Sequence, residues 1–292
     1  MKFYCKLTKI STGLSLSLLC GLTTAATESD QTVVVADEVV SAQRAVLAST
    51  TKGAGFGPQS PRDIDSVAGS NARVFEAAPS YQEMNLCNIH FHEGAEHKGG
   101  EFTKYAGNGD GKGYGTGFEY AGELSESELA PIDTPIGKLE HGGLAPGDTI
   151  EVHYVHSSAQ VQPGPTLGAC LSDAIKNPQL RVETQVYVLV NDADALDFVM
   201  LTETGEVNGV QQALNIPTNT GDAVQYTGST TGPGYNEAGS PFQVSWSVRP
   251  KVAKVNILSV GEWFKDNIFN EDHAHGVRNL VVNPDLLSNI EG

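Results

Sequence analysis

Hydrophobic and polar residues alternate along several stretches of this chain, and a period of two residues is typical of β-strands. In "DTIEVHYVHSS", Ile150, Val152 and Tyr154 share one face, while Glu151 and His153 share the other. "RVETQVYVLVND" alternates through ten residues, and "PFQVSWSVRPKVAKVNIL" adds one or two further strands. Strand patterns dominate the chain, so we expect a mainly β protein.

Few segments have a helical pattern. "SVGEWFKDNI" predicts a short helix, with Ser259 as its N-cap and Glu262 three residues later as the partner in a capping box. The glycine-rich stretch "YAGNGDGKGYGTGFEYAG" does not fit the calcium-loop spacing, so we interpret residues 106–117 within it as an exposed insertion of unassigned role.

The beginning of the chain differs in composition from the rest. Residues 1–26 combine early lysines, a short apolar run and the small residues "TTAA", which predicts a secretory signal peptide and a periplasmic or secreted protein. A lipoprotein signal at Cys20 is disfavoured because Leu19 stands where such signals have a small residue. Residues 27–50 show no clear period and suggest a linker, which leaves residues 51–292 as one domain.

Charge excludes some functions without assigning one. The 35 acidic and 18 basic residues give a net charge of −17, which repels nucleic acids and anionic membranes. No stretch after the signal is long and apolar enough for a membrane-spanning helix. We therefore expect neither a nucleic-acid partner nor a membrane span, and the oligomeric state stays open, a dimer included.

Two cysteines, Cys87 and Cys170, remain once the signal peptide is removed. In an oxidising compartment an isolated pair most simply forms a disulfide. The alternative is metal ligation by Cys87, which lies close to several histidines.

The stretch "NLCNIHFHEGAEHKGGEF" concentrates histidines on a candidate strand. Residues i and i+2 of a strand share a face, so His90 and His92 project together, opposite Ile89 and Phe91. His153 lies on a second candidate strand, also opposite an apolar face. Three imidazoles and one open position form a tetrahedral catalytic zinc site.

Two further residues on these strands have the right spacing to support such a site. A zinc-bound histidine needs an acceptor on its other ring nitrogen. Asn88 precedes His90 by two residues and Glu151 precedes His153 by two, so each shares a face with its histidine.

Other interpretations of the histidines remain. A His-x-His pair is often only a pair of hydrogen-bonded polar side chains. "HFHEGAE" also resembles the metal-binding strand of cupins, in which Glu96 would ligate iron or manganese. However, Met84 and Thr103 stand where cupins have glycine, and no asparagine follows in "YVHSS".

Five motifs occur in the order found in one known family. "QSPRDID", "NIHFHEGAEH", "EVHYVH", "YTGSTTGP" and "VSWSV" resemble segments of α-class carbonic anhydrases, from about residue 55 to the C-terminus. The cysteine just before the histidines and the one after "EVHYVHS" are most similar to the δ-class.

The resemblance implies a single α-carbonic-anhydrase-like domain with a large, mostly antiparallel sheet and short peripheral helices. It implies a lyase that hydrates CO2 reversibly to bicarbonate and a proton by attack of a zinc hydroxide. It also implies roles for individual residues: Zn2+ on His90, His92 and His153; orientation of these ligands by Asn88 and Glu151; catalysis by Thr230, Glu96 and Thr231; packing by Trp246; bracing by His97 and His156; and a Cys87–Cys170 disulfide.

Within these roles, Thr230 would accept a hydrogen bond from the zinc hydroxide and donate one to Glu96, while Thr231 would line the substrate pocket. "GSTTGP" lacks the family's apolar residue before the threonine pair, so the choice between the two threonines is open by one position.

Proton transfer is a second departure from the α-class. No histidine lies between "QSPRDID" and the His-x-His strand, which leaves His141, His273 and His275 as candidates for a proton shuttle. Non-catalytic zinc binding on the same fold, a cupin-like metalloenzyme, and cobalt or iron in place of zinc remain alternatives.

Overall fold

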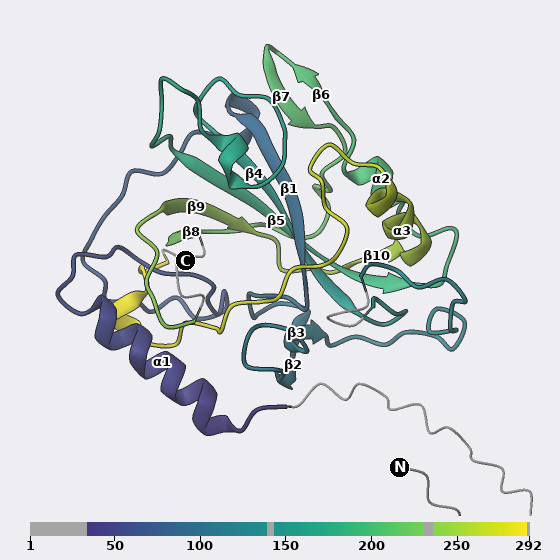
Figure 1. Cartoon of the computed structure of the whole chain (residues 1–292), viewed down its shortest axis with the longest axis horizontal. Coiled ribbons are helices and arrows are strands. Elements are labelled where there is room, and N and C mark those ends of the chain that lie inside the picture. Colours follow the sequence, from purple (N-terminus) through teal and green to yellow (C-terminus); the bar gives the residue numbers. More distant parts are fainter. Residues whose placement is uncertain (1–33, 139–142, 231–235, 291–292) are drawn as a thin grey trace, which may run out of the picture. The chain divides into compact units, whose positions relative to one another are not determined.

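The computed structural model describes residues 34–138, 143–230 and 236–290 (Figure 1). The strands are β1 (Asn85–Glu93), β2 (Phe102–Asn108), β3 (Thr116–Tyr120), β4 (Thr149–Ser157), β5 (Leu180–Val190), β6 (Thr204–Val207), β7 (Val210–Ala213), β8 (Val224–Ser229), β9 (Gln243–Val248) and β10 (Ala253–Asn256). The helices are α1 (Asp37–Thr51), α2 (Phe198–Leu201) and α3 (Ile257–Lys265), with 3-10 turns η1 (Tyr81–Glu83), η2 (Leu167–Cys170) and η3 (Pro284–Leu286). The expected mainly β class is confirmed.

The predicted signal peptide lies outside the described residues. Within the described ranges, no helix has the length and apolar character needed to cross a bilayer.

One sheet organises the molecule. Its strands run in the order β1-β4-β5-β9-β8, and β10 also pairs with β5 (Figure 1). The pairs β1–β4, β4–β5 and β8–β9 are antiparallel, whereas β5–β9 and β5–β10 are parallel. The sheet is therefore mixed, although antiparallel pairs are the larger share, as expected.

Both faces of this sheet are covered, which is why β4 is buried along its whole length. Ile150, Val152 and Tyr154 pack into a core that also contains Phe198 and Trp263, from the segments α2 and α3. Alternation along β4 places its histidine face opposite this apolar core. The sheet thus holds the polar site residues on a rigid, two-sided layer.

Within the stretch expected to be a linker, residues 27–33 lie outside the described residues, whereas residues 37–50 belong to helix α1. Its buried contacts come chiefly from Val40 and Leu47, seven residues apart on one face. The rest of the helix is polar or small, so the sequence shows little periodicity. Gln43 Nε2 donates to the carbonyl of Gly111 at 2.8 Å, which ties the helix to the glycine-rich segment.

The glycine-rich segment, expected to be an exposed insertion, has regular structure and is partly buried. It forms the antiparallel hairpin of β2 and β3. At its tip, Asp110 Oδ1 accepts from the backbone N–H groups of Lys112 and Tyr114, at 2.7 and 3.1 Å. Glycines supply the left-handed turns here: Gly109, with φ of +55°, has no room for a Cβ beside Tyr114 O.

Helix α3 lies where the sequence predicts a helix, but its cap differs. Asn256, not Ser259, is the N-cap, and its Oδ1 accepts from Leu258 N at 3.0 Å. Ser259 Oγ instead donates to Asn256 O at 2.6 Å and accepts from Phe198 N at 2.8 Å. The serine therefore joins α3 to α2, and the helix begins two residues before it.

Substitution of the observed cap tests this assignment. Asn256→Ala removes the only side-chain acceptor at the first turn of α3 among the described residues, so we expect a loss of about 1 kcal/mol in the free energy of unfolding. The matched change Glu262→Ala alters the residue of the predicted capping box and should cost less than about 0.5 kcal/mol. Urea denaturation of both variants measures this; a larger loss for Glu262→Ala would contradict the assignment.

Candidate metal centre

The antiparallel pairing of β1 and β4 brings the three predicted ligands together. His90 lies directly opposite His153 in the register, and His92 lies opposite Glu151. A β-bulge between Leu86 and Asn88 inverts the alternation of β1, so that Leu86 faces the same core as Ile89. From Asn88 onward the even-numbered side chains face the site. The ligand nitrogens of the three histidines lie within 4.8 Å of one another.

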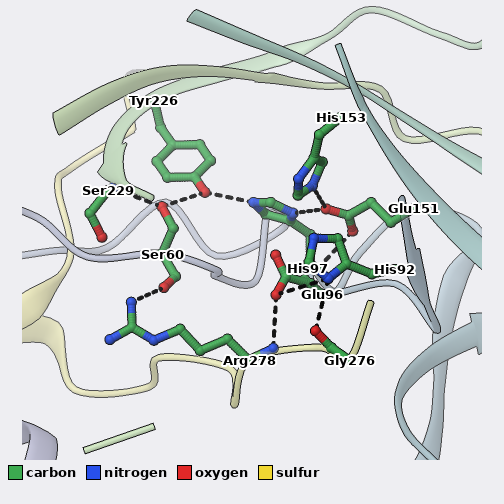
Figure 2. Close-up of polar contacts among 10 residues, drawn as sticks. All are labelled: Ser60, His92, Glu96, His97, Glu151, His153, Tyr226, Ser229, Gly276 and Arg278. Carbon is green, nitrogen blue, oxygen red and sulfur yellow. Dashed lines mark hydrogen bonds and ion pairs between the residues drawn. The ribbon is translucent and has the colours of Figure 1, made fainter. Parts of the chain in front are cut away.

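Each imidazole is held through the ring nitrogen that does not face this cluster. His90 Nδ1 donates to Asn88 Oδ1 at 2.6 Å, and His153 Nε2 donates to Glu151 Oε1 at 2.7 Å. His92 Nδ1 donates to the carbonyl of Gly276 at 2.9 Å (Figure 2). These oxygens only accept, so the protons lie on these nitrogens. The lone pairs that remain are on Nε2 of His90, Nε2 of His92 and Nδ1 of His153.

Glu151 is a buried carboxylate with a full set of donors. Besides His153, it accepts from the backbone N–H of His97 at 3.0 Å and from His97 Nδ1 at 2.6 Å. Burial alone would raise the pKa of Glu151, but His97 and His153 outweigh it and hold the pKa well below its usual range. A negative charge is therefore kept next to the histidine cluster, where it favours a bound cation.

The surroundings of His90 and His92 favour their neutral forms. Burial, followed by the neighbouring imidazoles, holds the pKa of His90 well below its usual value. Burial also lowers the pKa of His92, against the opposing effect of Glu96. Neutral imidazole is the form that binds a metal, so the site is prepared for one.

The cluster lies in a cavity of about 400 Å³. One part of its wall is apolar and consists of Val155, Val182 and Trp246. The ring of Trp246 packs 5.0 Å from that of His153, between centroids, as its predicted packing role requires. Lys112 and Tyr114 from the β2–β3 hairpin also line the cavity, so the hairpin contributes to the site.

Glu96 lies beside the histidine cluster and lines the same cavity. Its Oε1 accepts from the backbone N–H of Arg278 at 2.8 Å and lies 3.7 Å from His92 Nδ1, the nitrogen that faces Gly276 (Figure 2). It does not belong to the ligand cluster within the described residues. This arrangement removes the basis of the cupin-like interpretation, which requires Glu96 on the metal.

The predicted contact between Thr230 and Glu96 is absent. Thr230 lines the cavity, and its backbone N–H donates to Phe242 O at 3.1 Å. Among the described residues, no hydrogen bond joins its hydroxyl to Glu96. Thr231 lies outside the described residues. Thr231, the alternative one position along the chain, therefore stays a prediction.

The remaining predicted residues are buried supports. His97 Nε2 lies 2.6 Å from the hydroxyl of Tyr226 (Figure 2), and burial lowers the pKa of His156 to about 3. Cys87 and Cys170 form the expected disulfide, with a Cα–Cα distance of 4.9 Å.

Apart from His275, segment 275–278 is a part of the site that sequence reasoning missed. Gly276 O holds His92, and the backbone N–H of Arg278 holds Glu96. The backbone N–H of Val277 donates to Gly113 O at 2.8 Å, which fixes the tip of the hairpin. Backbone groups have no residue-type signature, so no motif could have identified them.

The sequence leaves three histidines as candidates for proton transfer, and the structure places two of them in different cavities. His275 lines the cavity, with its ring centroid 5.5 Å from that of His90 and its Nε2 2.6 Å from Glu271 Oε2. His273 lines a different, small cavity beside Glu93. His141 lies outside the described residues.

This is a mainly β protein in which three clustered histidines line one cavity and an acceptor holds each ring. These features define a potential metal-binding protein. A family model described as delta carbonic anhydrase matches residues 81–259. The match covers more than half of the chain, so this chain belongs to the delta carbonic anhydrase family.

Similar solved structures include three carbonic anhydrases. The first, identified from an active hydrothermal vent chimney and hyperthermostable, is 14% identical over 78% of this chain and 86% of that chain, with a TM-score of 0.30. The α-carbonic anhydrase of Thermovibrio ammonificans, in complex with sulfanilamide, is 17% identical over 76% and 84%, with a TM-score of 0.26. That of Photobacterium profundum is 14% identical over 84% and 95%, with a TM-score of 0.27. Among curated proteins, none matches this chain. The family assignment rests on the family model.

Two partly buried carboxyl groups, Glu93 at the end of β1 and Asp148 just before β4, predict a pH dependence of stability. Burial, with repulsion from Asp148, raises the pKa of Glu93 to about 7. The folded protein prefers the protonated acid, so the group is harmless below about pH 4.5 and destabilises as pH rises through 7. Glu93→Gln should therefore add about 2 kcal/mol to the free energy of unfolding at pH 8 and almost nothing at pH 4.

Thermal and urea unfolding at the two pH values provide the measurement. The exposed change Glu83→Gln serves as the control. Equal effects of Glu93→Gln at pH 4 and pH 8 would contradict the raised pKa.

Proposed function

We propose that this chain is a zinc-dependent carbonic anhydrase that hydrates CO2 reversibly to bicarbonate in the periplasm or outside the cell. The observation that carries the proposal is the three-imidazole cluster that lines one cavity, with the ring nitrogen of each histidine that faces away from the cluster hydrogen-bonded to an acceptor. Family membership supports the reaction, and the disulfide fits an oxidising compartment.

The donor set suits zinc. Three neutral imidazoles with an open fourth position are the ligands of catalytic zinc sites, and the carboxylate of Glu151 behind His153 stabilises the positive charge. Zinc held there would supply a hydroxide nucleophile at neutral pH, because it lowers the pKa of bound water to about 7.

The residues around the cluster would divide the remaining work. Val155, Val182 and Trp246 form an apolar wall beside the imidazoles, which suits a small apolar substrate such as CO2. Glu96, fixed by Arg278 N–H, offers its second oxygen to a hydroxyl donor. A threonine that donates to Glu96 can only accept from the nucleophile, which directs the lone pair of the nucleophile toward the substrate.

A second candidate function is zinc binding without catalysis. Its ground is that Thr230, one of the two threonines that could orient the nucleophile, makes no hydrogen bond to Glu96 among the described residues. The two functions differ in CO2 turnover by the zinc-loaded protein.

Removal and restoration of zinc test the proposal. We expect stopped-flow CO2 hydration to disappear when a chelator strips the protein and to return with one zinc per chain. His90→Ala and His153→Ala should each abolish activity and weaken zinc binding, whereas His273→Ala, outside the cavity, should do neither. A zinc-loaded protein with no turnover would contradict catalysis and leave zinc binding.

Single substitutions of the two threonines identify the hydroxyl that acts with Glu96. Thr230→Val and Thr231→Val keep the shape of the side chain and remove its donor. We expect only one of them to lower kcat, by roughly a hundredfold, since one preorganised hydrogen bond at a reacting group contributes about that much. Combining it with Glu96→Gln should add little further loss, because the two residues act as a unit. Full additivity would contradict the link to Glu96.

A further inference from the structure

Asn88, the residue that holds His90, is itself held by a loop. Its Nδ2 donates to the carbonyl of Gly164 at 3.1 Å, and the backbone N–H of Gly164 donates to Cys87 O at 3.0 Å. Gly164 thus makes a hydrogen bond to each of two adjacent residues of β1. The β-bulge explains why Cys87 is open to this contact: it has no partner residue in β4.

The other end of the same loop is fixed covalently. Six residues after Gly164, Cys170 forms the disulfide with Cys87, and both sulfur-bearing residues are fully buried. Ser157 Oγ also donates to Cys170 O at 2.7 Å. Between these ends, Thr166 and Leu167 line the cavity. The loop of residues 164–170 is therefore closed at both ends onto the bulge in β1.

This closure decides which way the amide of Asn88 points. A carbonyl only accepts, so Gly164 O requires the amide nitrogen to face it, and the amide oxygen then faces His90 Nδ1. That oxygen keeps the proton of His90 on Nδ1 and leaves Nε2 with a lone pair for the metal. If the amide turned over, its NH2 group would face Nδ1 and move the proton to Nε2, which would remove one ligand.

We infer that the Cys87–Cys170 disulfide is a positioning element of the metal centre: through Gly164 it fixes the amide of Asn88 and hence the metal-binding tautomer of His90. The inference rests on the proposed zinc site. It adds that metal affinity, and not only stability, depends on the oxidised state of the two cysteines.

Zinc affinity measured by competition with a chromophoric chelator tests this in four proteins. They are the wild type, Cys87→Ala/Cys170→Ala, Asn88→Asp, and the combination of all three substitutions. Loss of the disulfide should weaken zinc binding about tenfold when residue 88 is the native asparagine. In the Asn88→Asp background the loss should be less than about twofold, because a carboxylate presents an acceptor oxygen to His90 whichever way it turns.

Circular dichroism confirms that each protein is folded at the temperature of the titration. Should the disulfide-free proteins be unfolded, Cys87→Val/Cys170→Ala replaces the double alanine change in both backgrounds, since valine better fills the buried space of the sulfur while the disulfide stays absent. A dependence of the loss on residue 88 supports the inference. An equal loss in both backgrounds, or no loss in either, overturns it. Failure of the wild-type protein to bind one zinc per chain would instead overturn the proposed function.

Discussion

The register between β1 and β4 is the constraint on which the site depends. It sets His90 opposite His153, and it sets His92 opposite Glu151 on the same face. A slip of one residue would turn the histidines of β1 into the apolar core and expose Ile89 and Phe91 to the cavity. The apolar residues on the far side of both strands therefore fix the position of the three histidines, although none of them lines the cavity.

Burial of one carboxylate shapes the rest of the centre. Glu151 is fully buried, so its charge must be compensated by donors, and these come from His97 and His153. The same hydrogen bonds orient one ligand and lock the backbone just after Glu96. Segment 275–278 completes the arrangement by presenting backbone groups to His92, Glu96 and the hairpin. Side chains from two strands and the main chain of a third segment thus act together.

Much of this arrangement could be predicted from the sequence, because alternation decides which residues share a face. It correctly grouped Asn88, His90 and His92 on one face, and Glu151 with His153. It could not predict Gly276, whose contribution is a carbonyl, and it named His275 as a candidate for proton transfer without placing it at the cavity, because His275 is far from His90, His92 and His153 along the chain. Helix α1 was missed because its buried face is narrow, and the cap of α3 was misplaced because the hydroxyl of Ser259 serves α2 instead.

A crystal structure of the zinc-loaded protein tests the central claim most directly. The account predicts one zinc bound by Nε2 of His90, Nε2 of His92 and Nδ1 of His153, at about 2.0–2.1 Å, with a fourth position open to solvent. A metal bound by Glu96, or by fewer than these three histidines, would contradict it.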